Sequence, residues 1–272
     1  MKKIAFCTLS LALFLFNSCD LFKLDNYKAP SETLQGEIVD MNGNPVLTDQ
    51  GSEGIRVRLW ELSYWAQEHL NHNPPFYCRP DGTFQNTKLF PGIYEVEVDG
   101  PFIPLKRRHS LTGNMIADET QTVEIRNGRT AKVKYEVQPF LNVEWIGEPM
   151  VSNGRILANV RVTRAVSIND FRDKIQPMGD YRSDFTNMTD LQLFVSYSSS
   201  VGYRARDTRW STGIPYSGAD FQLLFGEPIS IQSTSIIPSG RTVFIRAAAR
   251  INYATGGVRR YNYSEVKEVP IP

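Results

Sequence analysis

Aromatic residues in two irregular, polar stretches have the chemistry to bind a carbohydrate. Aromatic rings can stack on the C–H faces of sugars while neighbouring amide and charged groups hydrogen-bond the hydroxyls. The stretch from Tyr203 to Tyr216 mixes rings with arginine, serine and glycine without a clean period, so its large side chains should be exposed. The candidate carbohydrate-binding residues are Trp60, Tyr64, Trp65, Tyr203, Arg209, Trp210 and Tyr216.

Trp210 is the first of these candidates because arginine, aspartate, serine and threonine surround it. Trp60 lies in an alternating run, and Trp65 follows that run and precedes a polar loop. The alternative for each ring is structural, since large aromatics also cover the ends of cores and domain junctions. The sequence therefore predicts an aromatic platform near Trp210 and leaves the structural alternative open.

The three histidines of the chain do not predict a metal site. His69 and His72 are three residues apart beside Glu68, and on a helix both imidazoles would share one face. Asparagines and prolines at 71–75 indicate a loop instead, and His109 is the only other histidine. We expect no bound metal and no cofactor.

Catalytic motifs are also missing from the sequence. The run from Asp40 to Asn44 begins like a calcium loop, but Pro45 and Gly51 stand where glycine and glutamate belong. No nucleophile elbow, zinc-protease helix or glycine-rich phosphate loop occurs. A carboxylate pair for glycoside hydrolysis could form in space, and nothing points to one. We expect a protein that is not an enzyme and has no catalytic residues.

Residues 1–18 have the pattern of a secretory signal peptide. Lys2 and Lys3 precede the apolar run from Ile4 to Phe16, which is shorter than the roughly 20 apolar residues of a spanning helix. Cys19 follows the small residue Ser18 and resembles the cysteine of a bacterial lipobox. That resemblance implies cleavage before Cys19 and lipid attachment to this residue.

The mature chain would carry neither a strong charge nor a disulfide. Loss of Lys2 and Lys3 leaves 28 basic against 29 acidic residues, whereas nucleic-acid binding calls for a strongly basic face. Cys7 leaves with the signal peptide and Cys19 carries the lipid, so Cys78 has no partner for a disulfide. We expect a half-buried, structural Cys78 and no nucleic-acid partner.

Residues 34–137 read as strands separated by turns. Apolar and polar residues alternate from Ile55 to Trp60, the period of a half-buried strand. Asn127-Gly128 joins the strand-like runs 122–126 and 131–137 and predicts a hairpin.

Several motifs in this region together resemble a transthyretin-like sandwich, also called the carboxypeptidase regulatory-like domain. They are G-E-I-V-D from Gly36, N-G-N-P from Asn42, R-V-R-L from Arg56, D-G-T-F from Asp81 and L-F-P-G-I-Y-E-V-E-V from Leu89. The resemblance covers residues 34–137.

Residues 138–272 read as a second β-domain. About seven strand-like runs, including 221–225, suggest an immunoglobulin-like or fibronectin type III-like sandwich. The sequence therefore predicts an all-β chain. Its parts are a signal peptide (1–18), a lipidated tether (19–33) and two β-sandwich domains (34–137 and 138–272).

The lipobox and the two β-domains together resemble uncharacterised lipoproteins of polysaccharide-utilisation loci. That resemblance implies a lipid-anchored outer-membrane protein facing the cell exterior, and Asp20 and Asp25 resemble a surface-export signal. It also implies a non-catalytic role in holding polysaccharide or oligosaccharide beside an outer-membrane glycan importer. The alternative is a structural or adhesive lipoprotein that packs against partner proteins and binds no glycan. A hydrolase is a third alternative, which would need a carboxylate pair or a metal in one pocket.

Overall fold

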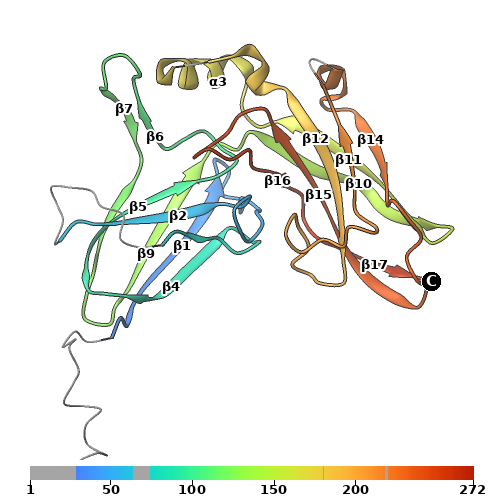
Figure 1. The fold of residues 1–272 in the computed structure, drawn as a ribbon, viewed down its shortest axis with the longest axis horizontal. Coiled ribbons are helices and arrows are strands. Elements are labelled where there is room, and N and C mark those ends of the chain that lie inside the picture. The colour runs from blue at the N-terminus through green and yellow to red at the C-terminus, as the bar shows by residue number, and fades with distance from the viewer. Residues whose placement is uncertain (1–28, 64–73, 180, 218–219) are drawn as a thin grey trace, which may run out of the picture.

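The computed structural model describes residues 29–63, 74–179, 181–217 and 220–272. Its strands build two β-sandwiches that lie side by side, one coloured blue to green and the other mostly yellow to red (Figure 1). The predicted all-β sandwich fold is confirmed.

The first sandwich encloses one hydrophobic cluster, formed by residues between Leu34 and Val137. Its sheets have the strand orders β4-β1-β9 and β3-β2-β5-β8, and β6 and β7 form a separate two-stranded arm. The strands are β1 (Glu32–Asp40), β2 (Arg56–Glu61), β3 (Phe76–Tyr77), β4 (Thr83–Leu89), β5 (Gly92–Asp99), β6 (Lys106–Arg108), β7 (Met115–Asp118), β8 (Gln121–Ile125) and β9 (Thr130–Val137).

The second sandwich has its own hydrophobic cluster, formed by Ile103 and residues between Phe140 and Ile271. Its sheets have the orders β10-β11-β14 and β13-β12-β15-β16, and β17 also pairs with β15. The elements are β10 (Leu141–Ser152), β11 (Arg155–Arg164), α3 (Ile168–Ile175), the 3-10 helices η1 (Gln176–Met178), η2 (Ser183–Thr186) and η3 (Asp220–Leu224), β12 (Met188–Ser196), β13 (Thr212–Pro215), β14 (Pro228–Gln232), β15 (Arg241–Ile251), β16 (Asn262–Tyr263) and β17 (Lys267–Ile271).

The alternating pattern of β2 produces one apolar and one charged face, as predicted. Val57 lies opposite Val98 of β5, and both side chains are buried. The next pair along the strands is Arg58 and Glu97, whose charged atoms lie 2.6 Å apart on the outer face. Side chains two residues apart share a face of a strand, so Trp60 lies on this outer face.

The predicted hairpin around Asn127-Gly128 is wrong. Both residues adopt positive φ, 61° and 67°, and form the expected tight turn. However, β8 pairs with β5 while β9 runs parallel to β1, so the two strands belong to opposite sheets. Glycine and asparagine permit this turn equally in a hairpin and at a sandwich corner, and the partner strands decide which one forms.

Helical segments in the second half differ from the expectation of strands alone. Ser167 caps α3 by accepting a hydrogen bond from the Asp170 amide (3.0 Å), and Phe171 and Ile175 bury one face of the helix. The run 221–225, expected as a strand, lies largely in η3. Short apolar runs do not distinguish a strand from a helical turn, because both bury about the same side chains.

A buried guanidinium joins the two sandwiches. Arg246 of β15 is 1% exposed and donates to the carbonyl oxygens of Thr48 (2.7 Å) and Pro80 (3.3 Å) in the first sandwich. It also donates to the Ser264 carbonyl (2.8 Å) and lies 4.4 Å from the centre of the Tyr263 ring. Burial lowers the pKa of Arg246 to about 10, so the group stays charged at neutral pH.

A second arginine fixes the hairpin that follows β15. Arg260 is 2% exposed and donates to the Asp99 carboxylate (2.7 Å) and to the Ser52 carbonyl (2.5 Å) of the first sandwich. At the hairpin tip, the Thr255 hydroxyl donates to the Gly100 carbonyl (2.6 Å). These contacts hold a loop of the second sandwich against the first.

We predict that Arg246→Leu lowers the free energy of unfolding by about 3 kcal/mol, because the buried carbonyl groups that accept hydrogen bonds from Arg246 would lose their donor. The shift of the urea midpoint, followed by tryptophan fluorescence, measures this loss. Arg241→Leu, at an exposed position of the same strand, is the matched control and should shift the midpoint little. Equal shifts in the two variants would contradict the role assigned to Arg246.

Candidate functional site

Trp210 is buried, so the expectation of an exposed aromatic platform at this residue is wrong. Its side chain is 3% exposed and belongs to the hydrophobic cluster of the second sandwich. The polar residues next to Trp210 in the sequence form a turn instead. Asp207 accepts backbone hydrogen bonds from Trp210 (3.3 Å) and Ser211 (3.0 Å), and its carboxylate binds Arg209 (2.7 Å). The polar residues next to Trp210 in the sequence therefore form the hydrogen bonds of a turn, and they do not indicate that the Trp210 ring is exposed.

The exposed ring beside Trp210 is Tyr197, which the sequence analysis did not single out. Tyr197 is 42% exposed and meets the Trp210 ring edge to face, with centroids 5.0 Å apart. The guanidinium of Arg241 lies 5.5 Å from the Tyr197 ring centre, and that of Arg209 lies 4.7 Å from the Trp210 ring centre. This patch is a surface of one exposed ring with two exposed arginines.

The other predicted residues do not gather around Trp210. Tyr203 packs with Phe194 of β12 and stacks on Tyr261 (5.9 Å). The residues next to Phe194 in β12 point to the other face of the strand and belong to the cluster that holds Trp210, so Tyr203 and Trp210 lie on opposite faces of this sheet. Tyr216 packs edge to face on Phe221 (4.7 Å).

Trp60 lies in the first sandwich, where its indole N–H donates to the Glu97 carboxylate (3.1 Å). Tyr64, Trp65 and Cys19, and the histidines at 69 and 72, lie outside the described residues. The carbohydrate-binding roles assigned to all these residues remain predictions.

A pocket of about 290 Å³ in the second sandwich combines aromatic walls with polar groups. Two segments far apart in the sequence build it, the η2 region and the hairpin after β15. Its lining residues are Arg182, Phe185, Asn252, Tyr253, Ala254 and Arg259. None of these residues is among the predicted candidates, although Y-R-S-D-F at 181–185 has the same mixture of rings and charges as the stretch around Trp210.

The aromatic walls of this pocket are held from behind by the core. The rings of Phe185 and Tyr253 are half-buried, with centroids 5.3 Å apart. Phe140 and Phe171 are buried and meet Tyr253 edge to face, at 5.8 and 5.3 Å. Tyr181 meets Phe185 in the same way at 6.2 Å. Such packing fixes the ring orientations before any ligand arrives.

The polar groups at the rim form one hydrogen-bonded chain. Arg182 Nε donates to Asp184 (2.9 Å), whose other oxygen accepts from Asn252 Nδ2 (2.9 Å). The amide oxygen of Asn252 accepts from Arg259 Nη1 (3.1 Å). The hydrogen bond from Arg182 holds the pKa of Asp184 below its usual range, so this carboxylate is ionised at neutral pH.

Burial raises the pKa of Tyr253, and the nearby charge of Arg107 partly opposes this shift. The Tyr253 hydroxyl is therefore neutral at neutral pH and can donate a hydrogen bond. Within the ranges that the structure describes, no hydrogen bond of this hydroxyl is found. The pocket thus offers two ring surfaces, a hydroxyl and guanidinium groups to a ligand.

The chain is similar to a solved structure of a DUF3823 family protein from Bacteroides uniformis. The two share 59% sequence identity with a TM-score of 0.84, over 89% of this chain and 100% of the other. This protein belongs to the DUF3823 family. No protein-family model and no curated protein matches the chain.

Two further solved structures share the fold of this DUF3823 protein at low sequence identity. One, from Bacteroides uniformis, is described as a "putative carbohydrate binding protein" and matches with 15% identity and a TM-score of 0.61. The other is a DUF3823 family protein from Parabacteroides merdae, with 16% identity and a TM-score of 0.56. Each match covers 89% of this chain and 100% of the other.

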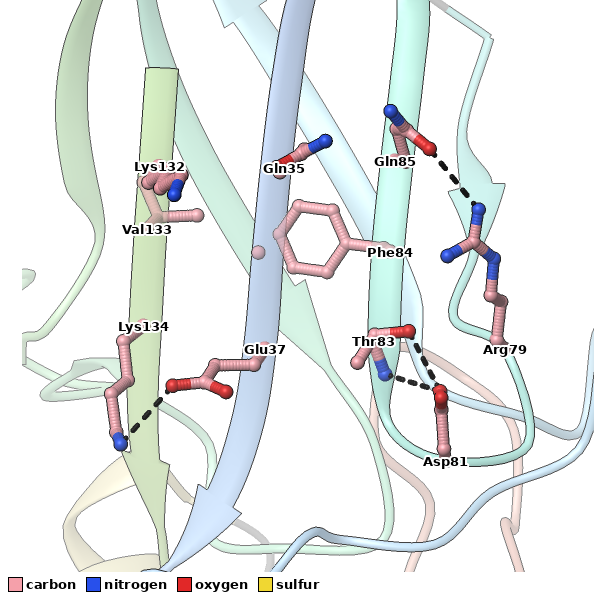
Figure 2. A pocket seen from close by; sticks show the side chains of 11 residues that line it. Gln35, Glu37, Arg79, Asp81, Thr83, Phe84, Gln85, Lys132, Val133 and Lys134 are labelled. Atoms are coloured by element: carbon pink, nitrogen blue, oxygen red, sulfur yellow. Dashed lines mark hydrogen bonds and ion pairs between the residues drawn. The ribbon is translucent and has the colours of Figure 1, made fainter. Parts of the chain in front are cut away.

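A wider depression of about 620 Å³ lies on the outer face of the β4-β1-β9 sheet of the DUF3823 protein (Figure 2). Polar side chains stand across it in two rows, Gln85, Gln35 and Lys132 in one and Thr83, Glu37 and Lys134 in the other. Several of them bind one another: Lys134 pairs with Glu37 (3.1 Å), and Arg79 donates to Gln85 (3.2 Å). This face is polar and self-paired.

No exposed ring interrupts the polar rows of that face. Phe84 is 2% exposed, and its ring lies against Gly36 of β1. A Cβ atom at Gly36 would lie 2.1 Å from the Phe84 ring, so only glycine permits this close approach. The ring therefore fills the core beneath the sheet and offers no stacking surface.

No group of three or more potential metal ligands occurs among the described residues. Within those same ranges, no helix combines the length and apolar character needed to span a bilayer.

Cys78 is fully buried rather than half-buried, with 0% exposure. Burial raises the pKa of its thiol well above the usual range, and the charge of Asp81 raises it further. The thiolate is the reactive form of cysteine, so Cys78 lacks both access and ionisation for nucleophilic chemistry.

We predict that Cys78 of the native protein does not react with Ellman's reagent at pH 8 and reacts fully in 8 M urea. The absorbance of the released thiolate measures the reaction, and the Cys78→Ser variant gives the background. Rapid labelling without urea would contradict the buried, protonated thiol.

Proposed function

We propose that this DUF3823 protein is a non-catalytic, lipid-anchored protein of the outer membrane that binds glycan at the cell surface. The observation that carries the proposal is the Phe185–Tyr253 pocket, in which core-supported rings stand beside guanidinium and hydroxyl groups. Sugars present apolar C–H faces and a surrounding belt of hydroxyls, and a site of this composition matches both. The printed description of one structural neighbour, "putative carbohydrate binding protein", agrees with this proposal.

Binding without hydrolysis agrees with the lining of the pocket. Glycoside hydrolases need two carboxyl groups flanking the scissile bond, about 5–10 Å apart. The residues that line the pocket include no aspartate or glutamate, and Asp184 beside it is committed to Arg182 and Asn252. The pocket therefore has groups for holding a sugar and lacks the pair needed to cleave one.

The proposed location rests on the signal sequence and Cys19. A diacylglycerol-modified cysteine would hold the protein on a membrane, and a partner importer in the same membrane would receive the bound glycan. Two acyl chains or more are needed for stable anchoring, which lipobox processing supplies.

A structural or adhesive function is the second candidate, and the polar face in Figure 2 favours it. Its paired rows of polar side chains form a broad surface without an exposed ring, as in the polar part of a protein–protein interface. Under this alternative the first sandwich contacts a partner protein, and the pocket in the second sandwich binds no sugar.

We predict that Phe185→Ala weakens glycan binding at least about tenfold, or 1.4 kcal/mol, because it removes one wall of the pocket. Affinity electrophoresis against plant, host and microbial polysaccharides measures the change. Tyr197→Ala, which removes an exposed ring outside the pocket, is the matched control and should bind like the original protein. Loss of binding in Tyr197→Ala alone would move the site to the Trp210 patch, and no retardation by any polysaccharide would favour the structural alternative.

We predict that Cys19→Ser abolishes lipid attachment and releases the protein from the membrane fraction, because serine offers no thiol to acylate. Metabolic labelling with radioactive palmitate and fractionation of the producing cells measure both effects. Cys7→Ser, inside the predicted signal peptide, is the control and should remain labelled. Palmitate labelling that survives Cys19→Ser would overturn the lipobox assignment.

A further inference from the structure

Positive charge surrounds the Phe185–Tyr253 pocket. Arg182 and Arg259 line it, and the charge of Arg107 acts on Tyr253 from the first sandwich. Two carboxylates lie nearby. Asp184 binds Arg182 and Asn252, and Glu119 lies 3.9 Å from Arg107. Each of these carboxylates is thus placed beside an arginine other than Arg259.

Arg259 is the guanidinium without a carboxylate. Among the residues that the structure describes, no ion pair involves it, and its one hydrogen bond is donated by Nη1 to the neutral amide oxygen of Asn252 (3.1 Å). A guanidinium has five N–H donors, so most of those on Arg259 remain for a ligand. Arg182, by comparison, already binds both oxygens of Asp184 and lies over the Phe185 ring at 5.5 Å.

The backbone before Arg259 is held in place. Gly256 and Gly257 adopt φ of 57° and 82° in a tight turn closed by hydrogen bonds between Thr255 and Val258. The hydroxyl of Thr255 and the guanidinium of Arg260 anchor the two sides of this hairpin to the first sandwich. The guanidinium of Arg259 therefore extends from a fixed backbone, and Asn252 fixes one of its nitrogens.

We propose that the pocket selects acidic glycans, and that Arg259 binds the carboxylate of a uronic acid residue whose ring packs against Phe185 and Tyr253. This inference rests on the proposed glycan-binding function and names its substrate class. The planar fork of a guanidinium matches the two oxygens of a carboxylate and forms two parallel hydrogen bonds. A neutral sugar leaves that fork unused, so the carboxylate adds affinity that a neutral analogue lacks.

The test compares each acidic glycan with a form that differs only at the carboxylate. Polygalacturonate, alginate and hyaluronan are titrated calorimetrically into the detergent-solubilised mature protein, each beside its carboxyl-reduced counterpart. We expect at least one acidic glycan to bind tenfold or more tightly than its reduced form. Dextran sulfate is a further probe, which distinguishes carboxylate recognition from general anion binding.

Variants assign the preference to Arg259. Arg259→Gln should remove the tenfold preference, because glutamine has neither the charge nor the planar fork of arginine. Arg259→Lys should restore only part of the preference, because lysine keeps the charge and lacks the fork. Arg241→Gln, an exposed arginine outside the pocket, is the matched control and should keep the full preference.

Several outcomes overturn the inference. Equal binding of acidic and reduced forms, tighter binding of dextran sulfate than of any uronate, or an intact preference in Arg259→Gln would each do so. If neutral glycans bind and Phe185→Ala abolishes that binding, the proposed function stands while the acidic preference fails. If no glycan of either kind binds, both fail together.

Discussion

The burial of Arg246 and Arg260 constrains the whole molecule. A charged guanidinium loses its hydration when buried, and this loss is offset only where fixed acceptors surround the group. The acceptors here are backbone carbonyls of the first sandwich and the Asp99 carboxylate, while the arginines belong to the second. Sliding of one sandwich over the other would leave these charges buried without acceptors. The relative position of the sandwiches is therefore specified by hydrogen bonding as well as by apolar contact.

The hairpin that follows β15 connects this junction to the proposed binding pocket. Arg259 and Arg260 are neighbours in the chain, yet Arg259 is exposed beside Tyr253 and Arg260 is 2% exposed at the junction. The charge of Arg107 reaches Tyr253 from the first sandwich. The pocket is thus assembled by the second sandwich and aligned by its contact with the first. A single sandwich would keep the aromatic walls and lose the anchor behind Arg259.

The sequence predicted what depends on local chemistry and missed what depends on pairing in space. Alternation identified the two faces of β2, and glycine with asparagine identified the turn at Asn127. Neither pattern contains the identity of the partner strand, so a sandwich corner was predicted as a hairpin. The same limit explains why Trp210 was wrongly predicted to be exposed and why Phe185 was not predicted at all. Both lie among charged residues, but the turn at Asp207 directs one ring inward, while the other meets a hairpin about seventy residues away.

Under the proposed function, the buried junction would also contribute to the affinity of the pocket, because it holds the binding groups in place before a ligand binds. Ordering a mobile side chain on binding costs about 0.5–1.5 kcal/mol, and ordering a loop costs more. In this protein Tyr253 is already packed against the buried rings of Phe140 and Phe171, and Phe185 is packed against Tyr253. The hairpin is already bonded to the first sandwich. Much of that cost is therefore met during folding. Under the proposed function, weak contacts to a single sugar would then produce useful affinity, because the entropy lost on binding would come largely from the glycan and from the exposed arginine side chains.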